Sequence, residues 1–185
     1  MTPGTLLVAA IALAQLAETP PSAGPEVPFV PTPPAVVGEM LRLAGVGPGD
    51  VVYDLGCGDG RIVIAAARRG ARGVGVDVDA RLVAEAREAA ARAGVADRVE
   101  LRTEDLFGVD LHDATVVTLY LFRRVNVALR PKLLAELRPG ARIVSHQFDL
   151  GDWRPDRTVV VDGHTVYLWT VPPRSSRHAG AAVPR

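Results

Sequence analysis

Three glycines recur at every second position in one short stretch of the chain, and an acid precedes the first of them by two positions. The stretch reads Asp54-Leu55-Gly56-Cys57-Gly58-Asp59-Gly60 and joins an apolar run, 51–54, to a segment, 61–69, whose apolar spacing predicts a helix. Glycine suits this place because the chain must turn sharply and let a ligand approach the backbone. The dinucleotide fingerprint, Gly-x-Gly-x-x-Gly, binds a pyrophosphate at the helix N-terminus. Here the spacing differs, and the carboxylate of Asp54 would repel a pyrophosphate.

Two further acids follow the next two predicted strands. Asp77 ends the strand predicted at 73–77, and Asp105 follows the strand predicted at 99–102. In open α/β sheets ligands bind in a crevice outside the carboxyl ends of the strands. The carboxylates of Asp54, Asp77 and Asp105 are therefore expected to face one crevice.

The three carboxylates match one cationic nucleoside, S-adenosylmethionine. Asp54 suits the ammonium and sulfonium of its methionine end, directly or through water. Asp77 can accept hydrogen bonds from both ribose hydroxyls. Asp105 can accept from the adenine amine, with Leu106 or Val78 as apolar walls against the ring. Taken singly, a glycine-rich turn is weak evidence, and such acids are more often helix caps or solvated loop residues. Together, in this order and spacing, they predict the cofactor.

A regular alternation of strands and helices positions these residues. The pattern predicts helices at 61–69, 80–93 and 125–137, and strands at 51–54, 73–77, 99–102, 115–119, 142–147, 158–161 and 165–171. Such alternation implies right-handed crossovers and a mostly parallel sheet. Asp162-Gly163-His164 separates the last two strands, and Asp-Gly is a strong hairpin signal. We therefore expect an α/β, Rossmann-like, seven-stranded sheet closed by an antiparallel C-terminal hairpin, which is the outline of a class I methyltransferase.

Composition excludes several classes of function. The chain has 185 residues, with 21 basic and 21 acidic side chains, and this length favours a single compact domain. Its one cysteine, Cys57, excludes an internal disulfide and a zinc finger. A net charge of zero gives no electrostatic footprint for duplex nucleic acid. The histidines are too scattered in sequence to suggest a metal cluster, so no metal site is expected.

The ends of the chain differ from its body. Residues 1–34 carry no Lys or Arg, an apolar run at 6–17 and a proline-rich stretch. The run is too short for a bilayer of about 30 Å, so it is either a secretory signal, a membrane anchor, or a frayed or membrane-touching helix. We expect a methyltransferase domain at 35–173 and a basic flexible tail at 174–185. That domain is expected in the cytoplasm, where the cofactor is made, and at a membrane if the run anchors it.

Three segments suggest a family. They are Phe29-Val30-Pro31-Thr32-Pro33, the glycine loop DLGCGDGR at 54–61, and FDLGDWRP at 148–155. They look like the pre-motif segment, motif I and late Phe-x-x-x-x-Trp-x-Pro segment of small protein-lysine methyltransferases, the class I enzymes related to those acting on the c subunit of mitochondrial ATP synthase and on adenine nucleotide translocase. This resemblance implies that Thr32 and the adjoining backbone close over the methionine end of the cofactor. The Pro-Thr-Pro segment reads equally well as a stiff linker. Asp77 departs from the glutamate of eukaryotic members, although either acid can bind a ribose.

The methyl acceptor is predicted from fewer residues. Methyl transfer to an amine needs mainly positioning and exclusion of water, and a lysine with a pKa of about 10.4 must first lose its proton. Tyr120 is the candidate catalytic residue, since it could shape the acceptor channel or instead cover the sheet edge. His146 could be a base, but a strand histidine is more often packed. The resemblance implies a protein lysine as acceptor, and we expect a monomeric enzyme. A small-molecule or RNA acceptor, or a cofactor-binding module without catalysis, remains the alternative.

Overall fold

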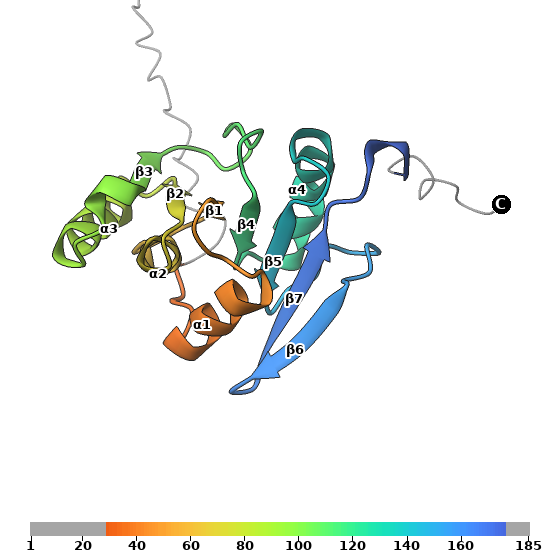
Figure 1. The fold of residues 1–185 in the computed structure, drawn as a ribbon, viewed down its shortest axis with the longest axis horizontal. Helices are drawn as coiled ribbons and strands as arrows, with labels where there is room; N and C mark the ends of the chain where they lie inside the picture. The colour runs from red at the N-terminus through yellow and green to blue at the C-terminus, as the bar shows by residue number, and fades with distance from the viewer. Residues whose placement is uncertain (1–28, 177–185) are drawn as a thin grey trace, which may run out of the picture.

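The computed structural model describes residues 29–176 (Figure 1). Its helices are α1 (Pro34–Leu43), α2 (Arg61–Arg68), α3 (Ala80–Arg92) and α4 (Arg123–Glu136). Its strands are β1 (Val51–Leu55), β2 (Arg72–Asp77), β3 (Val99–Thr103), β4 (Val116–Leu119), β5 (Arg142–His146), β6 (Arg157–Val161) and β7 (His164–Thr170). Two short 3-10 turns, Ala96–Arg98 and Arg174–Ser176, complete the described secondary structure.

The seven strands form one sheet in the order β3-β2-β1-β4-β5-β7-β6. Strands β1 to β5 pair in parallel, and β7 runs antiparallel between β5 and β6. The predicted mixed sheet with an antiparallel C-terminal hairpin is confirmed. The strand order reverses between β1 and β4, and ligands bind at such a switch point in open α/β sheets.

Helices cover both faces of the sheet (Figure 1). Successive strand residues point to opposite faces, so Val52 packs in the cluster that holds α1 and α2, whereas Tyr53 packs in the cluster that holds α4. Helix α3 adds Val83 to a smaller cluster with Val63 and Leu101. The two apolar layers fix the sheet between the helices, and the loops at the carboxyl ends of the strands are left to form a site.

Helix α3 begins at the predicted residue and ends at Arg92, one residue before the predicted end. The side chain of Asp79 accepts hydrogen bonds from the backbone amides of Arg81 and Leu82, which satisfies two of the free amides of the first turn. Gly94 follows the last turn at a φ of 67°, a conformation that glycine adopts without strain. These two signals lie within a few residues of the helix they bound, so the sequence alone carries them.

Every predicted element differs from its predicted range by one or two residues at one end or both, and three of these differences have a clear local cause. Helix α4 begins at Arg123 rather than residue 125, because its first two residues are arginines and add no apolar signal. Strand β5 ends at His146 rather than residue 147, because Gln147 has a φ of 67° and leaves the extended conformation. His164 belongs to β7, where it pairs with Val161. The hairpin turn is therefore only Asp162-Gly163, both at positive φ, which is the conformation of a two-residue type I′ turn.

The predictions for the two ends fall outside the described residues. These are the apolar run at 6–17, most of the proline-rich linker and most of the basic tail after residue 174. The signal, anchor and membrane-contact interpretations of the run stay predictions. Within residues 29–176, none of the helices has the length and apolar character needed to cross a bilayer.

Substituting Gly60 tests how closely α2 and α3 approach. A Cβ at Gly60 would lie 2.9 Å from the Cβ of Ala86, and its φ is 75°. Gly94 is the matched control, because its φ is 67° but nothing lies within 4 Å of the added Cβ. We expect Gly60→Ala to lower the free energy of unfolding by about 2–3 kcal/mol, from overpacking and backbone strain together. Gly94→Ala should cost about 1 kcal/mol from strain alone. Urea denaturation measures both, and equal losses would show that the helices do not meet at Gly60.

Candidate active site

A cavity of about 450 Å³ opens where β1, β2, β3 and β4 end. Its lining residues come from five stretches of the chain: 29–32, 54–62, 76–82, 104–107 and 120–125. The three predicted carboxylates, Asp54, Asp77 and Asp105, all line this cavity. The structure therefore brings together the acids that the sequence places at three different strand ends.

The glycine loop between β1 and α2 has positive φ at all three of its glycines. The values are 82° at Gly56, 52° at Gly58 and 75° at Gly60, which residues with a side chain rarely adopt. Gly56 lines the cavity, whereas Gly58 and Gly60 lie outside the lining. A Cβ on Gly58 would lie 2.3 Å from the ring of Phe29. Gly58 thus lets the N-terminal segment approach the loop, and Gly60 does the same for α3.

Asp54 is the most perturbed acid of the cavity. Its side chain is 3% exposed, and the hydroxyl of Thr118 donates a hydrogen bond of 2.7 Å to its Oδ1. Burial raises the pKa of Asp54 to about 7; the Thr118 hydrogen bond opposes this rise, and the nearby carboxylates of Asp77 and Asp59 add to it. A cation bound beside Asp54 would therefore relieve an unfavourable charge.

Asp77, at the end of β2, stabilises the glycine loop through hydrogen bonds. Its Oδ2 accepts from the backbone amide of Gly58 at 2.9 Å, and its Oδ1 accepts from that of Asp79 at 3.0 Å. A carboxylate offers about four acceptor sites, so two of them remain for a ligand. The predicted pair of hydrogen bonds to two hydroxyls fits that capacity.

Asp105 lies at the open end of the cavity. It is exposed, and its Oδ1 accepts from the backbone amide of Phe107 at 2.9 Å. Leu106 and Val78 line the cavity beside it; Leu106 is partly buried against the core, and the side chain of Val78 is half exposed. The three predicted residues at this end are thus brought together, as an acceptor next to two apolar side chains.

The segment 29–32 forms part of the cavity wall and is held in place by a hydrogen bond at Thr32. The carbonyl oxygen of Thr32 accepts from Nη1 of Arg61 at 2.8 Å, and Arg61 forms an ion pair of 2.6 Å with Asp59. Although burial works against it, the hydrogen bonds from Arg61 hold the pKa of Asp59 below its usual value. Sequence reasoning missed Phe29, Asp59 and Arg61. Asp59 and Arg61 lie inside motif I, which could have indicated them, but nothing local predicts that Arg61 reaches Thr32.

Tyr120 lines the cavity, while His146 lies behind it. His146 is fully buried and absent from the cavity lining, so it has no direct access to a methyl acceptor. Burial lowers the pKa of His146 to about 4, and His164 adds to this effect. The ring of Tyr120 lies on the imidazole with 3.8 Å between ring centroids. Tyr120 thus borders the cavity, and His146 is packed behind it.

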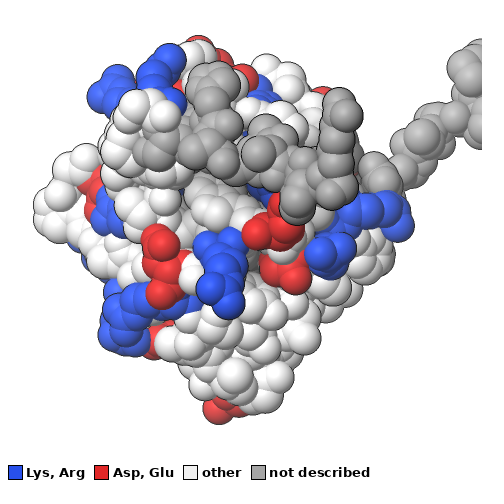
Figure 2. Space-filling view, turned by 90° about the vertical axis from the view of Figure 1, so that its right-hand side faces the viewer, with Lys and Arg blue, Asp and Glu red and all other residues white. Residues whose placement is uncertain are grey.

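Acidic groups outnumber basic ones in the cavity lining. The carboxyl groups are those of Asp54, Asp59, Asp77, Asp79, Glu104 and Asp105, and the guanidinium groups are those of Arg61 and Arg81. By contrast, Lys and Arg lie interspersed with Asp and Glu over the face drawn in Figure 2. The excess of carboxyl groups in the cavity favours a positively charged ligand.

Comparison with known proteins identifies the family. The sequence profile of the ANTKMT methyltransferase domain matches residues 54–157. A protein-lysine N-methyltransferase of Saccharolobus islandicus is 44% identical over 153 residues, which are 80% of this chain and 95% of that protein. The chain belongs to the ANTKMT methyltransferase family. The adenine nucleotide translocase lysine N-methyltransferase of mouse is 41% identical over 145 residues, or 78% of this chain, and the chain covers 62% of that protein's length.

Solved structures place the fold and the cofactor of this ANTKMT-family methyltransferase. A structure described as an RNA methyltransferase from Salinibacter ruber with bound S-adenosylhomocysteine is 56% identical, with a TM-score of 0.76, and covers 84% of this chain and 97% of its own. A methyltransferase from Geobacter sulfurreducens, also with S-adenosylhomocysteine, is 30% identical over 59% of this chain and 47% of its own, with a TM-score of 0.52. The protein is an S-adenosylmethionine-dependent methyltransferase, and the predicted family, fold, enzyme class and cofactor are confirmed.

The cavity residues fit this cofactor chemically. Asp77 has acceptor capacity left for hydroxyl groups, and Asp54 is a buried carboxylate whose ionisation a cation favours. A Cβ at Gly56 would lie 2.9 Å from Leu121, so this position needs a glycine. Leu106 and Val78 supply apolar surface for a ring. Each part of a charged nucleoside has a matching group on the cavity wall.

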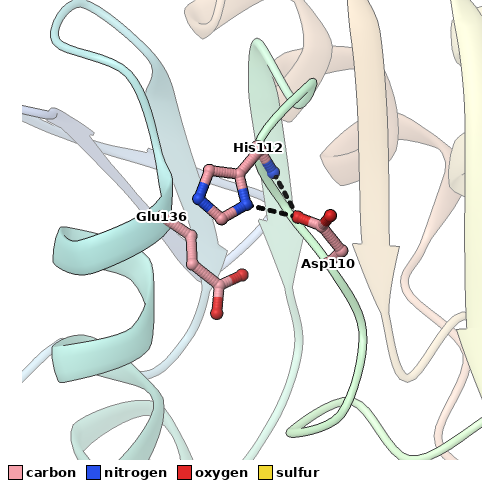
Figure 3. Close-up of side chains that lie close together, drawn as sticks. All are labelled: Asp110, His112 and Glu136. Atoms are coloured by element: carbon pink, nitrogen blue, oxygen red, sulfur yellow. Dashed lines mark hydrogen bonds and ion pairs between the residues drawn. The ribbon is translucent and has the colours of Figure 1, made fainter.

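A second cluster of ionisable side chains lies away from this methyltransferase site (Figure 3). Ligand atoms of Asp110, His112 and Glu136 all lie within 4.8 Å of one another, where the loop before β4 meets the end of α4. Sequence reasoning did not predict it, because α4 brings Glu136 to the loop. His112 Nδ1 lies 2.5 Å from Asp110, and Glu136 accepts from Lys132 and from the amide of Leu111. Since each carboxylate has a partner within the protein, we assign no metal to this cluster.

Proposed function

We propose that this enzyme transfers a methyl group from S-adenosylmethionine to a lysine amine of a protein. The observation that carries this proposal is the 44% identity to a protein-lysine N-methyltransferase of S. islandicus, nearly all of which the chain covers. Relatives described as lysine methyltransferases of the adenine nucleotide translocase and of the ATP synthase C subunit support the same acceptor class. A protein with an exposed lysine is thus the expected partner.

The charge of the cavity supports a lysine acceptor over a polyanion. Six carboxyl and two guanidinium groups line it, and such a field attracts an ammonium group and repels a phosphate backbone. RNA is nevertheless a second candidate acceptor. The observation in its favour is the 56% identity to a structure described as an RNA methyltransferase.

We propose these cofactor contacts from the geometry. Asp54 and Gly56 would hold the methionine end, Asp77 the ribose, and Asp105 the adenine amine between Leu106 and Val78. The wall at Thr32 would close over the methionine end, held there by Arg61. Gly58 and Gly60 would act through packing, because neither lines the cavity.

When bound, S-adenosylmethionine supplies a sulfonium-bound methyl group, which is transferred to an amine by in-line displacement of the sulfur. The chain's own residues need only hold the amine in position, keep it neutral and exclude water. Tyr120 and Leu121 line the cavity next to the segment 29–32, and we propose that Tyr120 borders the acceptor channel. The apolar side chains of Leu121 and Val125 lower the polarity there, which favours the neutral form of an entering lysine.

Residues of a single chain suffice to line the cavity, and we propose that the enzyme works as a monomer. The domain predicted at 35–173 leaves out residues 29–34, of which Phe29 to Thr32 line the cavity. We therefore propose that the functional unit includes residues 29–34.

Methyl transfer from labelled S-adenosylmethionine tests the acceptor. The full chain would be incubated with a bacterial lysate, and the label would then be located on protein, RNA or small molecules. We expect label in the protein fraction, on methylated lysine after acid hydrolysis. A parallel incubation with Asp77→Asn controls for methylation by enzymes of the lysate. Label that reaches only RNA or only small molecules would overturn the lysine assignment and leave the methyltransferase activity in place.

A further inference from the structure

His146 connects two wall segments of the cavity without lining the cavity itself. It is the last residue of β5 and is fully buried. Its Nδ1 lies 3.3 Å from the hydroxyl of Thr32, which is 114 residues away in sequence. The ring of Tyr120 lies on the imidazole, with 3.8 Å between centroids and 34° between planes. Thr32 and Tyr120 both line the cavity, so one buried ring contacts both walls from behind.

The orientation of this imidazole is itself constrained. Nε2 of His146 lies 2.9 Å from Nδ1 of His164 on β7, so both ring nitrogens have hydrogen-bond partners. The next residue, Gln147, has a φ of 67°, and its amide donates to the carbonyl oxygen of Thr165 at 2.7 Å. A non-glycine residue held at positive φ costs energy and persists only where the surrounding structure imposes it. The end of β5 is therefore held in one conformation.

We propose that His146 is a positioning residue for methyl transfer, which sets the width of the acceptor opening between Thr32 and Tyr120. Its hydrogen bond fixes the hydroxyl of Thr32, while Arg61 independently fixes the carbonyl oxygen of the same residue. Its ring face fixes the plane of Tyr120. Loss of the first contact loosens the wall over the cofactor, and loss of the second loosens the wall beside the acceptor.

The imidazole suits this task because it stays neutral. With a pKa of about 4, the ring has one nitrogen that donates and one that accepts at physiological pH. Thr32, Tyr120 and His164 contact the ring. A neutral ring keeps the same hydrogen bonds at all pH values well above 4.

Two substitutions of His146 separate its two contacts. His146→Asn keeps a polar atom where Nδ1 lies and can still bond to Thr32, but it removes the ring beneath Tyr120. His146→Phe keeps a ring beneath Tyr120 and removes the hydrogen bond. Thr32→Val keeps the volume at Thr32 and removes only its hydroxyl, so it tests the same hydrogen bond from the other side.

The full chain carrying each substitution would be compared with the unsubstituted protein in two measurements. Calorimetry gives the Kd for S-adenosylhomocysteine. The rate of label transfer at saturating S-adenosylmethionine is measured on whichever lysate fraction the unsubstituted enzyme labels, so this test does not depend on lysine being the acceptor. We expect His146→Asn to leave Kd within about twofold and to lower the saturated rate about tenfold. His146→Phe and Thr32→Val should weaken binding about fivefold, the effect of one lost hydrogen bond, and should lower the saturated rate by a smaller factor than His146→Asn does.

The Asn variant should affect mainly the rate and the Phe variant mainly the Kd, and this difference distinguishes positioning from simple loss of stability. A purely structural His146 would change Kd and rate in the same proportion in the Asn and Phe variants, and that result would overturn the proposal. If His146→Phe does not fold, the comparison of Thr32→Val with His146→Asn decides alone. A Thr32→Val variant that binds S-adenosylhomocysteine as tightly as the unsubstituted chain would also overturn the proposal.

Discussion

Replacing Asp54 with Asn should weaken binding of S-adenosylmethionine by about 10- to 100-fold at pH 8 and make the cofactor-free protein more stable. The carboxylate of Asp54 is buried, receives one hydrogen bond from Thr118 and lies near Asp77 and Asp59. Its charge is unfavourable until a cation arrives, and a charge-assisted contact contributes about 1.5–3 kcal/mol. Asn has nearly the same shape and can still accept from Thr118. The substitution should therefore weaken cofactor binding and stabilise the cofactor-free protein, a combination that a folding defect would not produce.

The stability effect has a defined pH window. The pKa of Asp54 is raised to about 7 in the folded protein, above an unfolded value of about 3.9. Between these two values the folded protein keeps a proton that the unfolded chain has lost. The free energy of unfolding of the cofactor-free protein should therefore fall as pH rises from about 4 to about 7, and stay level above that. Asp54→Asn should lack this slope and gain about 4 kcal/mol at pH 8, as measured by urea denaturation.

The affinity for S-adenosylmethionine depends on pH in the opposite direction to the stability. A cation beside Asp54 lowers its pKa, so binding below pH 7 must release a proton. The affinity of the unsubstituted enzyme for S-adenosylmethionine should fall by up to about tenfold per unit as pH drops from 7 towards 5. Calorimetry in buffers of different ionisation enthalpy would count the released proton. An Asp54→Asn variant with the same pH slope as the parent would show that another group causes it.

The parts of this molecule that the sequence predicts are those with local signals. The glycine loop and the Asp162-Gly163 turn each place the decisive residues next to the element they shape. The alternation of strands and helices then leaves few topologies, so the sheet order and the common edge of Asp54, Asp77 and Asp105 follow. The cofactor is predictable for the same reason, because each acid ends or directly follows its own strand.

The parts that escape prediction depend on contacts between distant residues. Nothing near Thr32 shows that its hydroxyl meets His146 or that its carbonyl oxygen meets Arg61. The sequence raises His146 as a base or a packed residue, and only the tertiary structure shows which atoms it contacts. Gly58 is a related case. Its place in motif I suggests a ligand contact, yet the ring it makes room for belongs to Phe29, a residue outside the motif.

Replacing Asp77 with Asn should lower the affinity for S-adenosylhomocysteine by about 100-fold, the combined effect of two hydrogen bonds to a charged group. Two acceptor sites of Asp77 are used by the amides of Gly58 and Asp79. Asn has one oxygen and one NH₂, so one of these amides would face a donor. The loop around Gly58 and Asp79 would then lose one of the two hydrogen bonds that hold it. Asp105→Asn is the matched control, since Asp105 is exposed and would supply a single hydrogen bond; we expect a loss of about tenfold or less.

A smaller ligand separates Asp77 from Asp54. The compound 5′-methylthioadenosine has the adenine and ribose of the cofactor but lacks its ammonium and sulfonium charges. Asp77→Asn should weaken its binding as strongly as that of S-adenosylhomocysteine, whereas Asp54→Asn should change it by less than about twofold, because no cation is left for Asp54 to attract. Calorimetry with both ligands on the three variants gives the comparison. If Asp54→Asn weakens 5′-methylthioadenosine as much as Asp77→Asn does, the two carboxylates do not divide the cofactor between its methionine and ribose ends.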